Sequence, residues 1–545
     1  MLDGSGWVAS GDKTASGLPL LAVAPNLPLQ IPSPWYEIGL YCVGVSASCP
    51  YHVTGLSIPG MPAVWMGHND TIAWGFTSAW IDEQDVIVVQ LNPANPMQYE
   101  WDGVWRDLTV REELLTINNE EEPIPLTIYQ THIGPLIPLT EDGSPGDQAL
   151  VVLWSGYRAP ADPVGALLRL DRAENWSDFR AALQTWGGAA VHALYADVQG
   201  HIGYQVAGNV PQRSSDDAGL IPVTHPGAAS EWSGYVAFDD LPSTFDPAAG
   251  YIIAANNPAE IESLLLDRTA HTTETFAAIQ SDTTSPFAAQ LLPYLLDIDL
   301  EDESLIEMRS WLAGWDFRFN MDSAQAALFS AFWLRLLDYT FADELGTVPC
   351  DCANVRQSML ELLDYPNHPW WDDVQTEQVT ERRDAVLRRA FEQAIADVTK
   401  RLGDDRTTWT WGALHTVRFT HVLTDIFGVS VIEDRFNQGP FPVSGSADTI
   451  NTTPSRTAPD RRFEVVAAPS ARLIIDLSNF ESSRAMLTTG QSNHLASAHY
   501  DDMIDPWRFI EYHPMLWENA SIEAAADAML ALEPAADLPT PPPDE

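Results

Sequence analysis

Residues 4–11 read GSGWVASG, and residues 20–27 read LLAVAPNL. Each stretch is a short apolar run beside glycine, serine or proline, which is the pattern of a strand that ends in a turn. The two runs therefore predict a hairpin at the start of the chain. Ser5 is the hydroxyl residue just before the first run. Taken alone, a Gly-Ser-Gly sequence in this place is typical of a flexible linker.

The composition describes a large, acidic protein. The chain has 545 residues, of which 45% are hydrophobic and 20 are tryptophan, enough to bury one large core or several. It carries 76 acidic and 28 basic residues, and its net charge is -48. We expect no nucleic acid partner, because binding one needs a basic surface. A solvated acidic surface explains the charge, with adaptation to high salt or partial metal binding as alternatives.

Targeting and redox signals are sparse in the sequence. No run of about 18 apolar residues occurs, so we expect no membrane span. The first residues also lack the pattern of a signal peptide. Four cysteines are too few for a dense disulfide framework. Cys42 and Cys49 could pair across a turn, whereas Cys350 and Cys352 are expected to remain two thiols in a loop.

The spacing of apolar residues changes along the chain. Residues 7 to about 260 show short apolar runs between turn signals, which predict strands. One helix interrupts them near residues 177–184, with Asn175 or Ser177 as its cap. From about 274 to 402, apolar residues recur every three or four positions, which predicts helices, and short strands follow. We therefore expect an α+β fold, divided into a β-rich half (1–260), a helical middle (261–405), C-terminal strands (406–520), and a final helix with a disordered, acidic, proline-rich tail (521–545).

A longer run carries a more specific signal. Residues 57–77 read SIPGMPAVWMGHNDTIAWGFT, and residues 252–258 read IIAANNP. Together with the stretches 4–11 and 20–27, these motifs resemble the β chain of the penicillin acylase family of N-terminal-nucleophile hydrolases. Matching motifs run in order from Trp7 to Trp517. The resemblance implies a four-layer αββα sandwich, with the helical middle packed on the sheets and the last strands completing the sandwich.

The resemblance also implies that the nucleophile is an N-terminal residue exposed when a precursor is cut, with its own α-amino group as the base. Ser5 is the candidate nucleophile, although the family spacing of three residues before Trp7 falls on Gly4. Either one residue has been lost and Ser5 is the nucleophile, or the hydroxyl is gone. The 19-residue spacing from Trp7 to Asn26 matches the family, and this register selects Gly4. Asn26, where many members carry His, is expected to help orient the amine by hydrogen bonding, with a simple turn residue as the alternative.

Two further positions imply an oxyanion site. By resemblance, Ser78 donates its backbone N–H to the oxyanion, and Asn256, the first residue of an Asn-Asn pair, donates its side-chain amide. We expect residues 7–10 and 252–256 to lie on adjacent central strands, with Ser5 facing Asn256.

Residues 82–85 read DEQD. Two acids separated by a residue whose carbonyl can point inward suit a hard cation with oxygen ligands. Penicillin G acylases hold calcium at this run together with the carbonyl of a later proline, which implies Asp82, Gln84, Asp85 and Pro211 as calcium ligands here. The alternative is an acidic turn without metal. We expect no organic cofactor.

The leading hypothesis is an acylase-type amidohydrolase whose Ser5 cleaves small acyl amides, such as β-lactam side-chain amides or acyl-homoserine lactones. Since family members are cut from a precursor, we expect an α chain as partner, absent from this sequence, and a periplasmic or extracellular location. The alternative is a catalytically silent relative that serves as a binding or structural protein. The shift between Gly4 and Ser5, the amide at Asn26 and a shortened loop after Asn257 favour this alternative.

Overall fold

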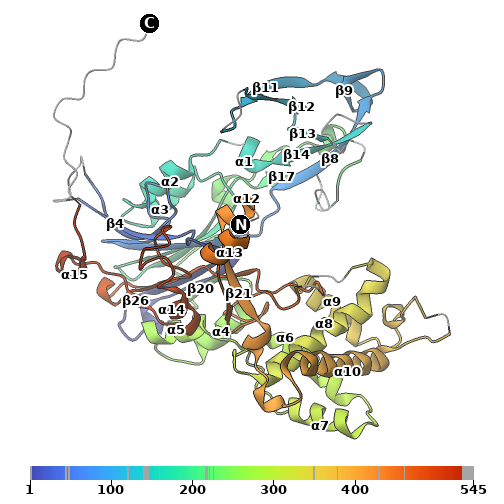
Figure 1. Cartoon of the computed structure of the whole chain (residues 1–545). Helices are drawn as coiled ribbons and strands as arrows, with labels where there is room; N and C mark the ends of the chain where they lie inside the picture. Colours follow the sequence, from blue (N-terminus) through green and yellow to red (C-terminus); the bar gives the residue numbers. More distant parts are fainter. Residues whose placement is uncertain are drawn as a thin grey trace.

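Two β-sheets form the centre of the protein, seen in a computed structural model (Figure 1). The structure describes residues 3–42, 46, 49–118, 122–138, 147–158, 160–214, 219, 221–224, 226–347, 350–376, 378–427, 430–459 and 461–530. The first sheet runs β20 (Tyr251–Ala255), β1 (Asp3–Ala9), β2 (Leu20–Pro28), β24 (Ala471–Asp476), β25 (Arg484–Leu487) and β26 (His513–Pro514), with β23 (Ala467–Pro469) also paired to β2. The second sheet runs β19 (Ser243–Phe245), β16 (Ile202–Ala207), β15 (Val191–Asp197), β7 (Ile72–Ser78), β6 (Met66–Asn69), β5 (His52–Ser57) and β4 (Tyr36–Tyr41).

Helices cover the outer face of each sheet. Helices α4 (Pro258–Leu266) and α5 (Thr273–Gln280) lie on the first sheet, where Trp7 shares an apolar cluster with Ile261 and Phe276. Helices α2 (Pro163–Leu170) and α3 (Trp176–Leu183) lie on the second sheet, where Phe179 packs on Tyr195 with ring centroids 5.1 Å apart. The order helix, sheet, sheet, helix confirms the expected αββα sandwich and the α+β class.

The two sheets approach each other closely at two glycines. A Cβ atom on Gly6 of β1 would lie 2.8 Å from Cδ1 of Leu194 on β15. A Cβ atom on Gly75 of β7 would lie 3.0 Å from Cβ of Val23 on β2. Larger residues at these positions would push the sheets apart, so the glycines permit tight packing where β1 crosses the second sheet.

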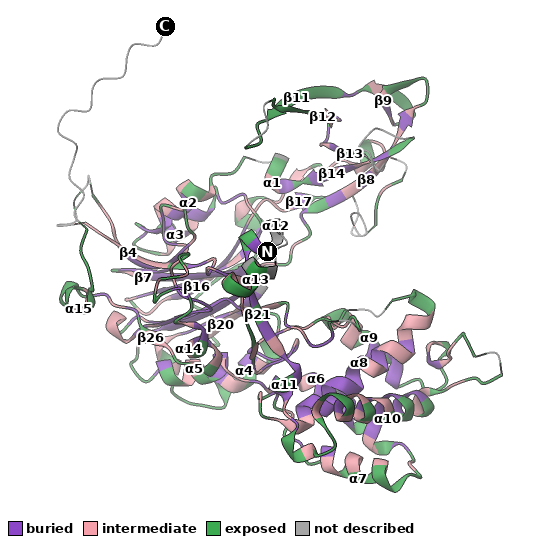
Figure 2. Cartoon of the chain, viewed as in Figure 1, coloured by how far each residue is buried: buried purple, intermediate pink, exposed green. Residues whose placement is uncertain are grey.

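Most of the helical middle forms a lobe beside the sandwich. Its helices are α6 (Pro286–Asp297), α7 (Glu303–Leu312), α8 (Ala324–Leu345), α9 (Ala353–Leu363) and α10 (Arg383–Leu402). Their buried faces turn toward one another (Figure 2), and Phe332 of α8 meets Phe391 of α10 within a separate apolar cluster. The resemblance led us to expect the whole middle on the sheets. In the structure, α4 and α5 pack on the first sheet, whereas α6–α10 bury their apolar faces mainly against each other.

The remaining described elements surround this framework. One outer sheet runs β10 (Val104–Asp107), β9 (Asn95–Trp101), β8 (Gln84–Asn92), β14 (Gln148–Trp154) and β13 (Leu136–Pro138), beside the ladder β11 (Thr109–Leu115) with β12 (Ile124–Gln130). Smaller ladders join β17 (Pro211–Gln212) to β18 (Gly234–Tyr235), and β21 (Thr416–His421) to both β22 (Gln438–Pro442) and β3 (Gln30–Ile31). The short helices are α1 (Ser155–Arg158), α11 (Trp411–Leu414), α12 (Val422–Phe427), α13 (Ser430–Phe436), α14 (Ile504–Phe509) and α15 (Asn519–Ala525).

The cysteines and the chain end differ in part from expectation. Cys42 pairs with Cys49, and Cys350 pairs with Cys352, so the prediction of two free thiols at the second pair is wrong. The final helix ends at Ala525. The predicted disordered tail, residues 533–545, lies outside the described residues, which end at residue 530. Of the helices described, none is both long and apolar enough to cross a membrane.

Polar residues of the 57–77 motif hold the turn between β6 and β7. The Asn69 side-chain oxygen accepts from the backbone N–H of Thr71 at 2.8 Å and of Ile72 at 2.9 Å. Its Nδ2 donates to the carbonyl of Ala173 at 2.8 Å, which ties this turn to the segment after α2. His68 is fully buried and stacks on Phe480, and burial lowers the pKa of its imidazole to about 3. His68 is therefore a neutral core residue, not an acid–base group.

Asp171, at the end of α2, is a buried carboxyl in the same region. Its Oδ2 accepts from the backbone N–H of Val64 at 3.2 Å, while Oδ1 has no hydrogen-bond partner among the described residues. Burial raises the pKa of Asp171 to about 7, although the Val64 N–H and Arg172 favour the charged form. Folding therefore shifts this carboxyl toward its protonated form.

We predict that Asp171→Asn removes a pH-dependent loss of stability. A carboxyl whose pKa is raised on folding contributes stability that is fully present below its unfolded pKa and lost as pH rises through about 7. One pKa unit corresponds to about 1.4 kcal/mol, so the loss amounts to a few kcal/mol. The measurement is the melting temperature of both proteins from pH 4 to pH 9. The melting temperature of the variant should rise relative to that of the native protein as the pH increases. A difference in melting temperature that does not change with pH would contradict the assignment.

Candidate active site

Ser5 lies on β1, which is hydrogen-bonded on both edges. The register places Ser5 opposite Ala24 of β2 and opposite Ala255 of β20. Residues 7–9 of β1 and 251–253 of β20 pair directly, so the two strands are neighbours as predicted, but β20 lies at the edge of the first sheet and not at its centre. Asn256 comes one residue after the last pair, so Ser5 is opposite Ala255 and not opposite Asn256 as we expected.

The faces of β1 follow from the alternation of side chains along a strand. Trp7 and Ala9 belong to the cluster under α4 and α5, whereas Val8 belongs to the core between the sheets. Alternation therefore places the half-buried Ser5 on the helix-facing side with Trp7. Gly4 falls on the side that faces the second sheet.

Gly4 itself has a backbone that favours glycine. Its φ is +146°, and a Cβ atom built on it would lie 2.3 Å from the carbonyl oxygen of Ala24. No side chain fits, in this structure, at the position that the family spacing selects for the nucleophile.

Asn26 is buried, with 5% of its surface exposed. It lies near the end of β2, opposite Asp3 of β1 and Pro469 of β23. It shares a strand face with Ala22 and Ala24, and hence with Ser5. Asn26 therefore lies diagonally from Ser5 across the ladder, on the same side of the sheet.

The two oxyanion candidates lie on different sheets. Ser78 ends β7 and is 5% exposed, and its Oγ accepts from the N–H of Trp80 at 3.3 Å. Asn256 is exposed and directly follows β20. The neighbouring Thr77 bridges the sheets, because its Oγ1 donates to the carbonyl of Ala254 at 3.2 Å. The ends of β7 and β20 are thus joined one residue before Ser78 and two residues before Asn256.

Sequence reasoning missed a histidine beside this bridge. His192 of β15 pairs with Thr77, and by alternation it faces the first sheet, as Leu194 does. Its Nδ1 lies 2.7 Å from the hydroxyl of Tyr204. Burial lowers the pKa of His192 and raises that of Tyr204 to about 12, so both groups are neutral near pH 7. The signal in the sequence was a lone His inside the strand at residues 191–197.

Glu83 was also missed, although it stands inside the DEQD run. It is buried, and its carboxylate accepts from the N–H of Ala190 and from the hydroxyl of Ser155, at 3.2 Å for the latter. Burial raises the pKa of Glu83, and the two hydrogen bonds oppose this shift. The carbonyl of Ala190 in turn accepts from the N–H of Ala79 at 3.1 Å. Glu83 thereby fixes the backbone that follows Ser78.

The proposed calcium ligands do not fit a metal ion. Both oxygens of Asp85 accept from Nε of Arg213 at 3.1 Å, and Oδ2 also accepts from the indole N–H of Trp232. Asp82 and Gln84 are exposed, and Pro211 lies on β17, two residues before Arg213. Within the described ranges, no group of three or more His, Cys, Asp or Glu side chains is arranged to hold a metal. An arginine already occupies the position where the resemblance implied a cation.

A buried polar cluster lies under the face that carries Ser5 and Asn26. Gln280 of α5 donates to the carbonyls of Val23 at 3.2 Å and Leu473 at 3.4 Å, and it accepts from the hydroxyl of Tyr512 at 2.5 Å. Arg472 is 1% exposed and donates to Oδ1 of Asn451 at 2.8 Å. The helix-facing side of the sheet is therefore polar beside its apolar cluster.

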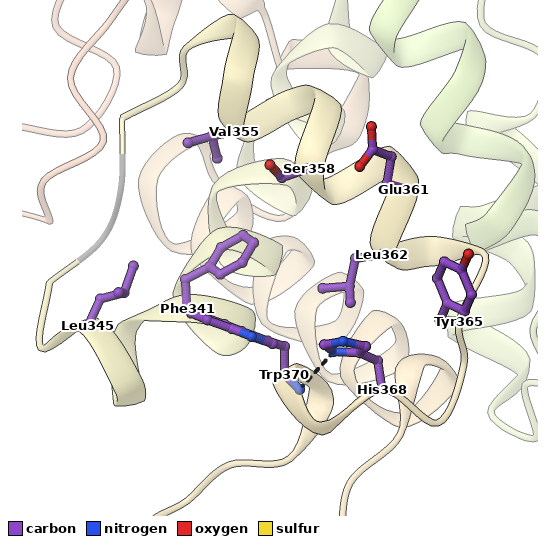
Figure 3. A pocket seen from close by; sticks show the side chains of 9 residues that line it. All are labelled: Phe341, Leu345, Val355, Ser358, Glu361, Leu362, Tyr365, His368 and Trp370. Carbon is purple, nitrogen blue, oxygen red and sulfur yellow. Dashed lines mark hydrogen bonds between the residues drawn. The ribbon is translucent and has the colours of Figure 1, made fainter. Parts of the chain in front are cut away.

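A cavity of about 670 Å³ opens in the helical lobe (Figure 3). It is lined by Phe341, Leu345, Val355, Ser358, Glu361, Leu362, Tyr365, His368 and Trp370. Its lining comes from α8, α9 and the segment that follows, and includes none of the candidate residues above.

A four-layer αββα sandwich whose first strand is a central strand is the fold of the N-terminal-nucleophile hydrolases. The family model described as penicillin amidase matches residues 4–524. The chain therefore belongs to the penicillin amidase family.

Known relatives carry acylase names. The chain is 28% identical over 566 residues to the acyl-homoserine lactone acylase QuiP of Pseudomonas aeruginosa, covering 92% of this chain and 65% of that protein. It is 25% identical over 560 residues to the penicillin acylase 2 proenzyme of Pseudomonas sp. strain SE83, covering 96% and 68%. A solved thermostable penicillin G acylase from Alcaligenes faecalis has the same fold, with a TM-score of 0.68 at 19% identity, covering 97% of this chain and 100% of that one. The chain spans 65%, 64% and 60% of the length of three QuiP relatives.

We predict that Gly4→Ala destabilises the chain. The new Cβ would lie 2.3 Å from a backbone oxygen at a φ of +146°, which costs about 1–3 kcal/mol unless the end of β1 detaches. The control is Gly314→Ala, where the nearest atom to the new Cβ is 3.6 Å away. Urea unfolding measures stability, and hydrogen exchange at Ser5 and Gly6 measures detachment. Equal behaviour of the two variants in both measurements would contradict the strained conformation.

Proposed function

We propose that this chain is the β portion of an acylase-type amidohydrolase. The observation that carries the proposal is the arrangement of β1, β20 and β7, in which the first strand begins beside the strand ends that carry Asn256 and Ser78. Membership of the penicillin amidase family supports the reaction class.

Ser5 acts as the nucleophile once it has become the N-terminal residue. Inside the uncut chain, two peptide bonds hold its side chain on the helix-facing side. At a free N-terminus, rotation about the Cα–C bond moves the amine, the side chain and Hα round together, each into the place of the next. This rotation brings the hydroxyl toward the second sheet without moving β1. Cleavage before Ser5 also removes Asp3 and Gly4, and with them the pairs to Asn26 and Pro25.

The proposed reaction uses the side chains and backbone groups near Ser5. Ser5 Oγ attacks the acyl carbonyl, and its proton passes to the α-amine of the same residue. The amide of Asn256 and the N–H of Ser78 stabilise the oxyanion, while Asn26 helps to orient the amine. Collapse expels the amine product, which takes up the proton, and leaves an acyl ester on Ser5. Water hydrolyses this ester by the same steps in reverse. No organic cofactor takes part.

The substrate class is small acyl amides. The printed names of the relatives support this, since they are acylases of acyl-homoserine lactones and of penicillins. An α chain, cut from the same precursor, completes the acyl pocket. The two disulfides support a periplasmic or extracellular location, because such bonds persist in oxidising compartments.

We predict that a chain beginning at Ser5, produced with its α chain, hydrolyses a chromogenic phenylacetyl or fatty-acyl amide. The chain beginning at Met1 should be inactive, because an acylated amine cannot accept a proton. The rate should rise with pH as the α-amine loses its proton, near pH 7.7–8.0 for an ordinary α-amine. Ser5→Ala should abolish activity, and Asn256→Ala should lower the rate by a factor of about 10²–10³.

Ser10→Ala is the matched control, because it removes a hydroxyl just beyond the far end of β1. Full activity in the Ser5→Ala chain would refute Ser5 as the nucleophile.

A second candidate function is binding without catalysis. One observation favours it: Gly4, at the family spacing, has no side chain, while Ser5 lies on the opposite face. A chain beginning at residue 4 with Gly4→Ser tests this candidate. Activity in that chain, together with none in the chain beginning at Ser5, would identify a silent relative that one substitution reactivates.

A further inference from the structure

Arg213 joins two segments that are far apart in the sequence. Its Nε donates to both oxygens of Asp85 at 3.1 Å. Its Nη2 donates to the backbone carbonyl of Asp82 at 3.0 Å and lies 3.2 Å from Oδ2 of the same residue. One guanidinium therefore binds a carbonyl and two carboxylates of the segment that follows Ser78.

The pair of Arg213 and Asp85 is largely shielded from water, whereas Asp82 is exposed. The side chain of Arg213 is 15% exposed and that of Asp85 is 9% exposed. The indole N–H of Trp232 donates to Asp85, and the Trp232 ring lies 5.9 Å from the guanidinium carbon. Gly219 closes another side, where a Cβ atom would lie 2.3 Å from Oδ1 of Asp85. Asp85 thus has partners for both oxygens and little room for another ion.

The oxygen atoms around the guanidinium are those that a hard cation prefers. They comprise a bidentate carboxylate, a second carboxylate and a backbone carbonyl. A divalent ion at the same place would meet the fixed positive charge of Arg213. Metal and arginine therefore compete for one position.

We propose that Arg213 is a built-in counter-ion that replaces a divalent metal between Asp82 and Asp85. It fixes residues 82–85 against β17 and Trp232, and so positions the backbone after Ser78 without calcium. Arginine suits this role better than lysine, because its planar fork binds several oxygens at once. Removal of the guanidinium leaves an anionic hollow that calcium can enter.

Melting temperatures of the full chain test this role whether or not the protein hydrolyses amides. Native protein, Arg213→Ala and Arg213→Lys are each compared in calcium, in magnesium at equal ionic strength, and in a chelator. Native protein should respond equally to both ions, since both only screen the acidic surface. Arg213→Ala should melt roughly 2–5 °C lower and recover more in calcium than in magnesium, which resists dehydration and demands tighter geometry. Arg213→Lys should melt at an intermediate temperature without a calcium preference.

Two controls isolate the site. Arg318→Ala removes one positive charge from a more exposed pair, whose atoms are 3.7 Å apart, and should show no calcium preference. Arg213→Ala combined with Asp85→Asn should lose the recovery in calcium.

A calcium preference of the native protein that Asp85→Asn abolishes would overturn the proposal, because the site would then hold metal beside Arg213. An Arg213→Ala protein that melts like the native protein would overturn it as well. If Arg213→Ala does not fold, the native and Arg213→Lys titrations still decide the question.

Discussion

The enclosure of β1 is the constraint on which the rest of the structure depends. Both edges of the strand are paired, one to β2 and one to β20. Both faces are covered, with Trp7 against the helices and Val8 against the second sheet. A shift by one residue would turn Trp7 toward Leu194, where even a Cβ on Gly6 would come within 2.8 Å. The register of β1 is therefore fixed, and this register determines on which face of the sheet each side chain near the start of the chain lies.

The sequence predicted those parts of the fold that depend on local pattern. The runs at 4–11 and 20–27 became β1 and β2, and the helix predicted near 177–184 is α3, whose cap Asn175 accepts from the N–H of Asp178 at 3.1 Å. The resemblance supplied the layer order, which the structure confirms. The separate lobe of α6–α10 was not predicted, because apolar periodicity shows which face of a helix is buried but not which element covers it.

The site was only partly predictable, for a similar reason. Neighbouring strands followed from the motifs, but the face of Ser5 depends on a one-residue register that the spacing alone left open between Gly4 and Ser5. Arg213 and Asp85 are 128 residues apart in the sequence, so no local motif predicted their contact. His192 stood alone in an apolar strand, where a core histidine and a site residue look alike. Contacts between distant segments determine these roles, and a single sequence does not display them.

Basic residues are scarce in this chain, so the few buried arginines are important for its structure. With 76 acids and 28 basic residues, most carboxylates cannot each have a basic partner of their own. A buried guanidinium therefore has a specific structural role. Arg213 joins two segments beside Ser78, and Arg472 reaches Asn451 below the first sheet with no paired carboxylate among the described residues. Salt screens the exposed acids strongly but reaches shielded pairs much less. The surface can therefore adjust to its ionic surroundings while the arrangement around β1, β7 and β20 stays fixed.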